Sequence, residues 1–156
     1  MNLDNIPNEI IKKRDAIECN FIFSLYKDPT LIDDYKNIAN GTDIITEDGI
    51  FYYGLALELN RTGYLAFDNI SIYTFLSDKE ILKDGFERRG GYKTIQELTS
   101  LLNLDNVSAY YDELVKNNMM IRLHKAGFSI LHDIDKINQM SSSELYDYYD
   151  FKLNNV

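Results

Sequence analysis

The sequence is poor in the residues that mark several common protein classes. Among its 156 residues it has two prolines, no tryptophan and a single cysteine, Cys19. One cysteine excludes an internal disulfide, and its place in an apolar helical run predicts a buried, inert thiol. The missing disulfide framework favours a reducing compartment. With so few prolines and 13% aromatic residues, the chain is expected to fold rather than to remain disordered.

Basic charge and long apolar runs are scarce as well. Lys and Arg number 16 against 25 Asp and Glu, which gives a net charge of -9. Gripping a phosphate backbone needs a surplus of cations, so direct nucleic-acid binding is disfavoured, whereas an acidic surface suits basic protein partners. No apolar stretch approaches the ~20 residues that span a bilayer, and the first residues are too polar for a secretory signal. We therefore expect no membrane contact and a cytoplasmic location.

Apolar residues at helical spacing are what the sequence has in abundance. They predict an all-α fold in two parts: a globular body of about six short helices, residues 1–103, and a C-terminal αα-hairpin, residues 104–156, leading to a linker. In the body, Gly63, Gly90 and Gly91 are expected at the turns between helices. The predicted body helices cover 9–27, 29 to about 39 (closed by Asn40-Gly41), 46–61, a segment capped by Asp68 or Asn69, a segment capped by Asp78 with Ile81 and Leu82, and 92–102 with Ile95, Leu98 and Leu101.

Two of these predictions concern which residues face inward or cap a helix. The helix over 46–61 begins with Thr46 as its cap, and Ile50, Tyr53 and Leu57 are expected on one face, with Leu55 and Leu59 beside them. In the hairpin, a long helix from Asp105 is followed by a final helix. Ser141 and Glu144 have the spacing of a capping box at the start of that final helix.

Motifs that carry chemistry are absent from the sequence. Neither a Walker phosphate-binding loop nor a GxGxxG pattern occurs. Arg88 and Arg89 lie beside the Gly90-Gly91 pair, where a turn between helices is favoured over a phosphate site.

The titratable residues also favour structural roles. His124 and His132 are eight residues apart, too far for a helical metal pair. Neither lies beside a nucleophile in a strained turn, and acidic pairs such as Glu47-Asp48 are explained by helix capping and solvation. We expect no catalytic residue, no cofactor and no metal, hence no enzyme.

Tyrosine is unusually frequent, with 12 residues, and it is enriched at protein interfaces because it joins a large apolar area to a polar tip. Adjacent tyrosines on a helix cannot share one face, so some of them are expected to meet a partner. The outer faces of the hairpin are predicted to self-associate as a symmetric dimer. The candidate interface residues are Tyr110, Tyr111, Leu114, Val115, Asn118, Met119, Met120, Leu123, Tyr146 and Tyr149.

Several local signatures occur in the order found in a known family. Asp28-Pro29 ends the first predicted helix, and Leu57-x-Leu59-x-x-x-Gly63 is followed by Asp68 and an apolar helix. Gly90-Gly91 then precedes Tyr92, Ile95 and Leu98, and Asn106–Phe128 opens the hairpin with the aromatic pair Tyr110-Tyr111. In order and spacing, over about residues 6–154, these signatures resemble the N-terminal domain of the replicative DNA helicase of the DnaB type.

The resemblance implies a role in assembly. Domains of that family pair through body and hairpin, and three pairs build a collar on a hexamer. The collar docks primase or a helicase loader, whereas ATP hydrolysis and DNA contact belong to a motor domain that follows a linker. The sequence departs from the family pattern at Phe23-Ser24, where a pair of small residues is usual, and at Gly49-Ile50, where a His-Arg pair is usual. These departures suggest a divergent member of phage or mobile-element type.

Three alternatives remain open at the level of sequence. One is a small helical hydrolase or transferase with buried carboxylates, which a deep pocket lined by two or more acids would favour. Another is a free-standing phage-type loader or decoy without a motor. The third is a helical DNA-binding regulator, which requires a basic face formed by Lys12, Lys13, Arg14, Lys83, Arg88 and Arg89.

Overall fold

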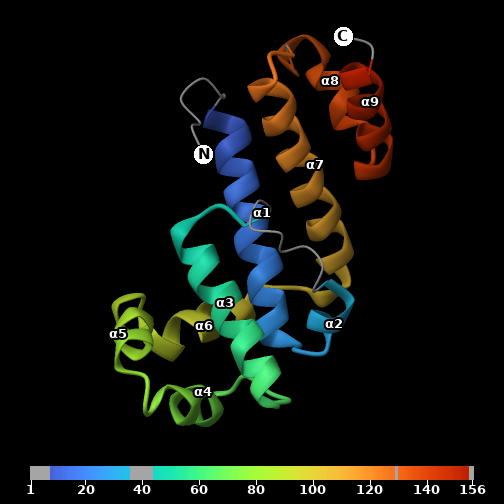
Figure 1. Cartoon of the computed structure of the whole chain (residues 1–156). Coiled ribbons are helices and arrows are strands. Elements are labelled where there is room, and N and C mark those ends of the chain that lie inside the picture. Colours follow the sequence, from blue (N-terminus) through green and yellow to red (C-terminus); the bar gives the residue numbers. More distant parts are fainter. Residues whose placement is uncertain (1–7, 36–43, 129, 155–156) are drawn as a thin grey trace. The chain divides into compact units, whose positions relative to one another are not determined.

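The structure, a computed structural model, describes residues 8–35, 44–128 and 130–154. Over these residues it consists of α-helices and short 3-10 helices without any strand, which confirms the predicted all-α class (Figure 1). The end of the second predicted helix and Asn40-Gly41 lie outside the described residues. The elements are α1 Asn8–Lys27, α2 Leu31–Tyr35, α3 Glu47–Thr62, α4 Asn69–Leu76, α5 Glu80–Arg88, α6 Gly91–Ser100, η2 Leu104–Asn106, α7 Val107–Lys125, η3 Ile130–Asp133, α8 Ile134–Asn138 and α9 Ser142–Asn154.

The chain forms two compact units, which share α1. Unit 1 combines Met1–Ile17 with Ser108–Val156, and unit 2 is the continuous segment Glu18–Val107. The sequence-based division at residues 103 and 104 places the start of α1 in the body. In the structure that part of α1 instead groups with the C-terminal helices, because its buried side chains pack on α7.

Local capping chemistry determines where several helices of unit 2 begin and end. The Thr46 hydroxyl accepts a hydrogen bond of 2.9 Å from the Gly49 amide at the start of α3, and the Asp68 carboxylate accepts one of 2.8 Å from the Ser71 amide at the start of α4. Gly63 closes α3 with a φ of 105°, and Gly90 and Gly91 link α5 to α6 with φ of 100° and 64°. Glycine adopts these angles without steric cost, so all three predicted turn glycines are confirmed.

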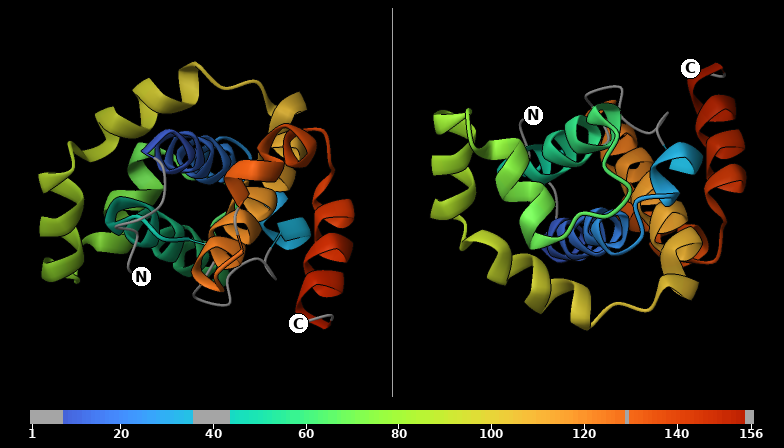
Figure 2. Two further views of the ribbon diagram at one scale, coloured as in Figure 1. Left: turned by 90° about the horizontal axis from the view of Figure 1, so that it is seen from above. Right: turned by 90° about the horizontal axis from the view of Figure 1, so that it is seen from below.

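The core of unit 2 lies between α1 and α3 and is rich in aromatic rings. Phe23 packs against Tyr52 with ring centroids 4.9 Å apart, and the Tyr26 hydroxyl donates a 2.6 Å hydrogen bond to the Tyr52 carbonyl. Figure 2 shows α4, α5 and α6 following one another around this pair of helices. The buried residues that α4, α5 and α6 contribute to unit 2 are Ile72, Phe75, Leu76, Gly85, Phe86, Gly91 and Ile95.

The inward face of α3 differs from the predicted one. Ile50, expected in the core, is 57% exposed. Tyr53, Leu55 and Leu59 are buried as expected, Leu57 is half-buried, and Tyr52 and Ala56 are buried as well. Large apolar residues occupy adjacent positions on α3, so two neighbouring faces of the helix could face inward. The face that contains Tyr52 is buried because it packs against the aromatic side chains of α1.

Two further details of unit 2 correct the sequence predictions. Asp78 does not cap α5: the cap position is Lys79, and the Asp78 carboxylate forms a 2.8 Å ion pair with the Lys79 ammonium. Ile81 is 87% exposed, and α5 turns Phe86 inward instead. Of the apolar residues predicted for the sixth helix, Ile95 is buried, whereas Leu101, just past the end of α6, is 85% exposed.

The C-terminal part of unit 1 has three consecutive helical segments: α7, a return segment formed by η3 and α8 (the return leg), and α9. Lys116 on α7 donates a 3.0 Å hydrogen bond to the carbonyl of Asn138, so η3 and α8 return along α7. The Ser142 amide then meets Asp112 at 3.3 Å, which places the start of α9 beside the first half of α7. A short return leg thus separates the two long helices of the predicted hairpin. The apolar core of unit 1 contains Ile10, Met120, Ile121, Leu123, Ile130, Ile137 and Leu145.

Candidate interaction sites

Four of the predicted interface residues are part of the protein's own interior. Leu114, Asn118, Met120 and Leu123 are 0%, 3%, 2% and 1% exposed. Within unit 1, α7 packs against both the first part of α1 and the return leg. More of its side chains are therefore buried than in a hairpin of two helices. These four positions therefore cannot form an outer contact surface.

The other predicted positions remain accessible in part. Tyr111, Val115 and Met119 are half-buried and lie four residues apart, so they form one stripe along α7. Tyr110 is half-buried beside this stripe, and Tyr146 on α9 is 56% exposed. The side chain of Tyr149 lies outside the described residues.

Phe151, on the same helix as Tyr146, is 64% exposed and was not anticipated from the sequence. Tyr148, on the same helix, is half-buried, and its hydroxyl donates a hydrogen bond to the Asp133 carboxylate.

Asn118 owes its burial to a polar contact inside unit 1. The Arg14 guanidinium, 1% exposed, donates a 2.8 Å hydrogen bond to the Asn118 side-chain oxygen and a 2.9 Å bond to Asp15. Lys116, also buried, lies 3.6 Å from Glu113 in addition to its bond to Asn138. Buried charges need such partners, because an uncompensated charge in the interior is strongly destabilising. Asn118 thus fixes α7 against α1 rather than meeting a partner.

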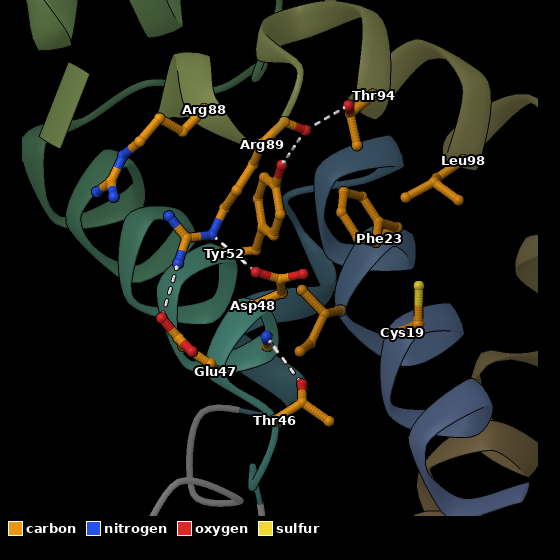
Figure 3. A pocket seen from close by; sticks show the side chains of 12 residues that line it. Cys19, Phe23, Thr46, Glu47, Asp48, Tyr52, Arg88, Arg89, Thr94 and Leu98 are labelled. Atoms are coloured by element: carbon orange, nitrogen blue, oxygen red, sulfur yellow. Dashed lines mark hydrogen bonds and ion pairs between the residues drawn. The ribbon is translucent and has the colours of Figure 1, made fainter. Parts of the chain in front are cut away.

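Unit 2 contains a pocket of about 560 Å³ beside the Gly90-Gly91 turn. Helices α1, α3, α5 and α6 each contribute to its walls, as Figure 3 shows. The walls are apolar on the side of α1 and α6, and charged where α3 begins and α5 ends. The lining residues are Cys19, Ile22, Phe23, Thr46, Glu47, Asp48, Gly49, Tyr52, Arg88, Arg89, Thr94 and Leu98.

Arg89 is the best-connected side chain of this pocket. Its Nε donates a 2.9 Å hydrogen bond to Asp48, its guanidinium lies 3.7 Å from Glu47, and it stacks on the Phe51 ring at 4.3 Å. Thr94 donates a 2.7 Å bond to the Arg89 carbonyl. With these partners Arg89 joins the end of α5 to the start of α3, which supports the turn interpretation of Arg88-Arg89 over a phosphate site.

A buried carboxylate holds the start of α3 in place. Glu18, 1% exposed, accepts hydrogen bonds from the Ile45 amide at 2.8 Å, from the Thr46 amide at 3.3 Å and from the Thr46 hydroxyl. A Cβ at Gly49 would overlap the Glu18 carboxylate and would lie 2.6 Å from Oγ1 of Thr46. Position 49 therefore requires glycine in this chain.

Two titratable groups that line the pocket have shifted pKa values. Burial raises the pKa of the Cys19 thiol, and the nearby carboxylates of Glu18 and Asp48 raise it further. Burial and Asp48 also raise the pKa of Tyr52 to about 12, although Arg89 acts in the opposite direction. Cys19 is half-buried rather than fully buried, which corrects the sequence prediction. Its Sγ points toward the pocket (Figure 3).

The acids of the pocket do not have the environment of catalytic groups. The side chains of Glu47 and Asp48 are 94% and 74% exposed, and Asp48 is paired with Arg89. Paired catalytic carboxyls are typically held in a desolvated site that excludes water. Although two acids line a pocket, as the enzyme alternative requires, their exposure gives that alternative little support.

The described part of the chain has no cluster of residues that could bind a metal ion. His124 is half-buried near the end of α7, and the side chain of His132 lies outside the described residues. Where side chains are described, no three His, Cys, Asp or Glu residues gather closely enough to hold a metal ion. Nor is any described helix both long and apolar enough to cross a membrane.

The basic face required by the DNA-binding alternative lacks several of its members. Arg14 is buried, Arg89 is 17% exposed and ion-paired, and Lys13 lies 3.5 Å from Glu113. Charges that are already neutralised by neighbouring carboxylates release few counterions from a phosphate backbone.

No known protein family, curated protein or solved structure matches this chain. The function must therefore be inferred from the residues and their arrangement.

Proposed function

We propose that the chain is a non-catalytic assembly domain of the DnaB N-terminal type, which self-associates through unit 1 and docks a replication partner such as primase or a helicase loader. The observation that carries this proposal is the order of its parts. A body of short helices, turned at Gly63 and at Gly90-Gly91, is followed by the long helix α7 and the returning legs that end in α9. The motifs that resemble the helicase family fall at these turns and helix starts.

Accessible apolar side chains in unit 1 support self-association. The half-buried stripe of Tyr111, Val115 and Met119 lies on α7, and the exposed rings of Tyr146 and Phe151 lie on α9. Aromatic side chains are enriched at protein interfaces relative to the rest of the surface. Unit 1 also has little net charge to oppose pairing, with 10 acidic against 8 basic residues, a net charge of -2.

Sedimentation velocity at micromolar concentration tests the self-association. We expect a dimer or a larger even-numbered assembly for the natural chain. The double substitution Val115→Asp with Tyr146→Ser should dissociate it, because it places a charge and removes a ring on the proposed surface. Leu65→Ser, which removes an equally apolar and 89% exposed side chain from unit 2, is the control and should leave the assembly intact. A natural chain that sediments strictly as a monomer would refute self-association.

In the proposed complete helicase, hexamer formation, ATP hydrolysis and DNA contact would depend on a motor domain outside this sequence. The partner-docking part of the proposal is tested separately, by the binding of purified primase or loader to this chain. If the chain self-associates but binds neither protein, the docking part of the proposal is wrong, and the chain is a self-association domain that does not serve DNA replication.

A further inference from the structure

The two units differ sharply in charge. Unit 2 has 15 Asp and Glu against 8 Lys and Arg, a net charge of -7 out of the -9 of the whole chain. The pocket beside the Gly90-Gly91 turn belongs to this acidic unit. A positively charged group that approaches unit 2 is therefore attracted over a distance set by the salt concentration, about 10 Å at 0.1 M.

At the pocket itself the negative charges face solvent and one of the positive charges is largely covered. Glu47 and Asp48 are 94% and 74% exposed, whereas the Arg89 guanidinium between them is 17% exposed. Arg88 carries an exposed positive charge on the rim, and in Figure 3 its side chain is directed away from Asp48. Both carboxylates already form ion pairs with Arg89, but most of their surface remains open to solvent, so the α3 side of the pocket still presents carboxylate oxygens to a ligand.

The opposite side of the pocket is apolar. Phe23 and Ile22 on α1 line it with 4% and 1% of their surface exposed, and Leu98 on α6 is half-buried. A volume of about 560 Å³ exceeds that of one side chain and lies in the range of ligand pockets. A suitable occupant thus has a cation on one side and apolar groups on the other.

We propose that this pocket docks a basic amphipathic segment of a partner protein, with its Lys or Arg side chains on Glu47 and Asp48 and its apolar side chains on Phe23 and Leu98. Burial is the main cause of the raised pKa of Cys19, and the carboxylates of Glu18 and Asp48 raise it further. Docking at unit 2 does not depend on self-association through unit 1, so each proposal can fail while the other holds.

Cys19, the single cysteine, provides a site-specific readout. Its alkylation by iodoacetamide, an uncharged reagent, is measured with and without a short amphipathic peptide of lysine and leucine. At a peptide concentration about ten times Kd, occupancy should slow alkylation roughly tenfold. A cation bound elsewhere on the surface would instead lower the thiol pKa and speed the reaction, so slowing reports occupation of the pocket.

Two ligand controls separate charge from apolar contact. The same peptide with glutamate in place of lysine should give no protection, because it meets Glu47 and Asp48 with like charge. Spermidine, which carries the cations without apolar side chains, should protect weakly. Equal protection by either compound overturns the proposal, as does an unchanged alkylation rate with the lysine peptide.

Matched variants test the position of the charge. Glu47→Gln should weaken protection about threefold to fivefold, the effect of one exposed ion pair. Glu80→Gln is its control, because Glu80 is likewise the exposed first residue of a helix, α5, but does not line the pocket. Circular dichroism checks that both variants are folded. Equal protection in the natural chain and Glu47→Gln would place the peptide elsewhere and overturn the proposal.

Discussion

Two glycines on α3 have opposite surroundings, and this contrast gives a prediction at the scale of single residues. Gly49→Ala should lower the free energy of unfolding by about 1–3 kcal/mol, because the new methyl group overlaps the Glu18 carboxylate. Gly54, in the same helix, has no packing neighbour within 4 Å of its Cβ position apart from its chain neighbours and the backbone of its own helix. Gly54→Ala should therefore stabilise the protein by about 0.5–1 kcal/mol through its helix propensity. Urea denaturation measures both changes, and a neutral Gly49→Ala would contradict the close packing at Glu18.

Gly49 also illustrates what sequence alone does not reveal about single residues. Its need for glycine arises from Glu18, which lies 31 positions earlier and is buried because it accepts hydrogen bonds from the amides of Ile45 and Thr46. Nothing local in the sequence distinguishes Glu18 from the many solvated acids. The positive φ of Gly63 was predictable, because a glycine that follows the last apolar residue of a helix is a local signal.

Helix starts are the feature of the elements that the sequence predicts best. Thr46, Asp68 and Ser141 each accept a hydrogen bond from an amide in the first turn of the helix they precede. Capping depends on residues three positions apart, so it is readable locally. The inward face of a helix depends on what packs against it, which is why Ile50 and Met120 were assigned to the wrong sides.

The cap of α9 gives a prediction at the scale of one element. Ser141 accepts a 3.1 Å hydrogen bond from the Glu144 amide and donates a 3.3 Å bond to the Glu144 carboxylate. Ser141→Ala should lower stability by about 1 kcal/mol and speed amide exchange in the first turn of α9. Ser143→Ala is the matched control in the same turn, and it should be neutral or slightly stabilising. Equal effects of the two substitutions would mean that the cap contributes nothing measurable.

For the whole molecule, the structure shows where along the chain the acidic charge and the exposed apolar residues lie, which composition alone does not give. The net charge of -9 predicted basic partners without a location. The structure concentrates that charge in unit 2 and leaves unit 1 nearly neutral, with its exposed rings on α9. The contact surface that the sequence predicts in the C-terminal region stays a prediction, whereas the pocket combines residues from four helices and has no local sequence signal.

This separation of charge predicts opposite salt dependences for the two proposed interactions. Raising NaCl from about 0.1 M to about 1 M shortens the screening length from about 10 Å to about 3 Å. Peptide docking at Glu47 and Asp48 should weaken, because its attraction is between exposed charges. Self-association should be unchanged or tighter, because it buries apolar rings between chains that repel one another through their net charge of -9. Sedimentation velocity and Cys19 alkylation at both salt concentrations measure the two effects on the same sample. Dissociation of the assembly at high salt would show that ion pairs, rather than the apolar residues of α7 and α9, hold it together.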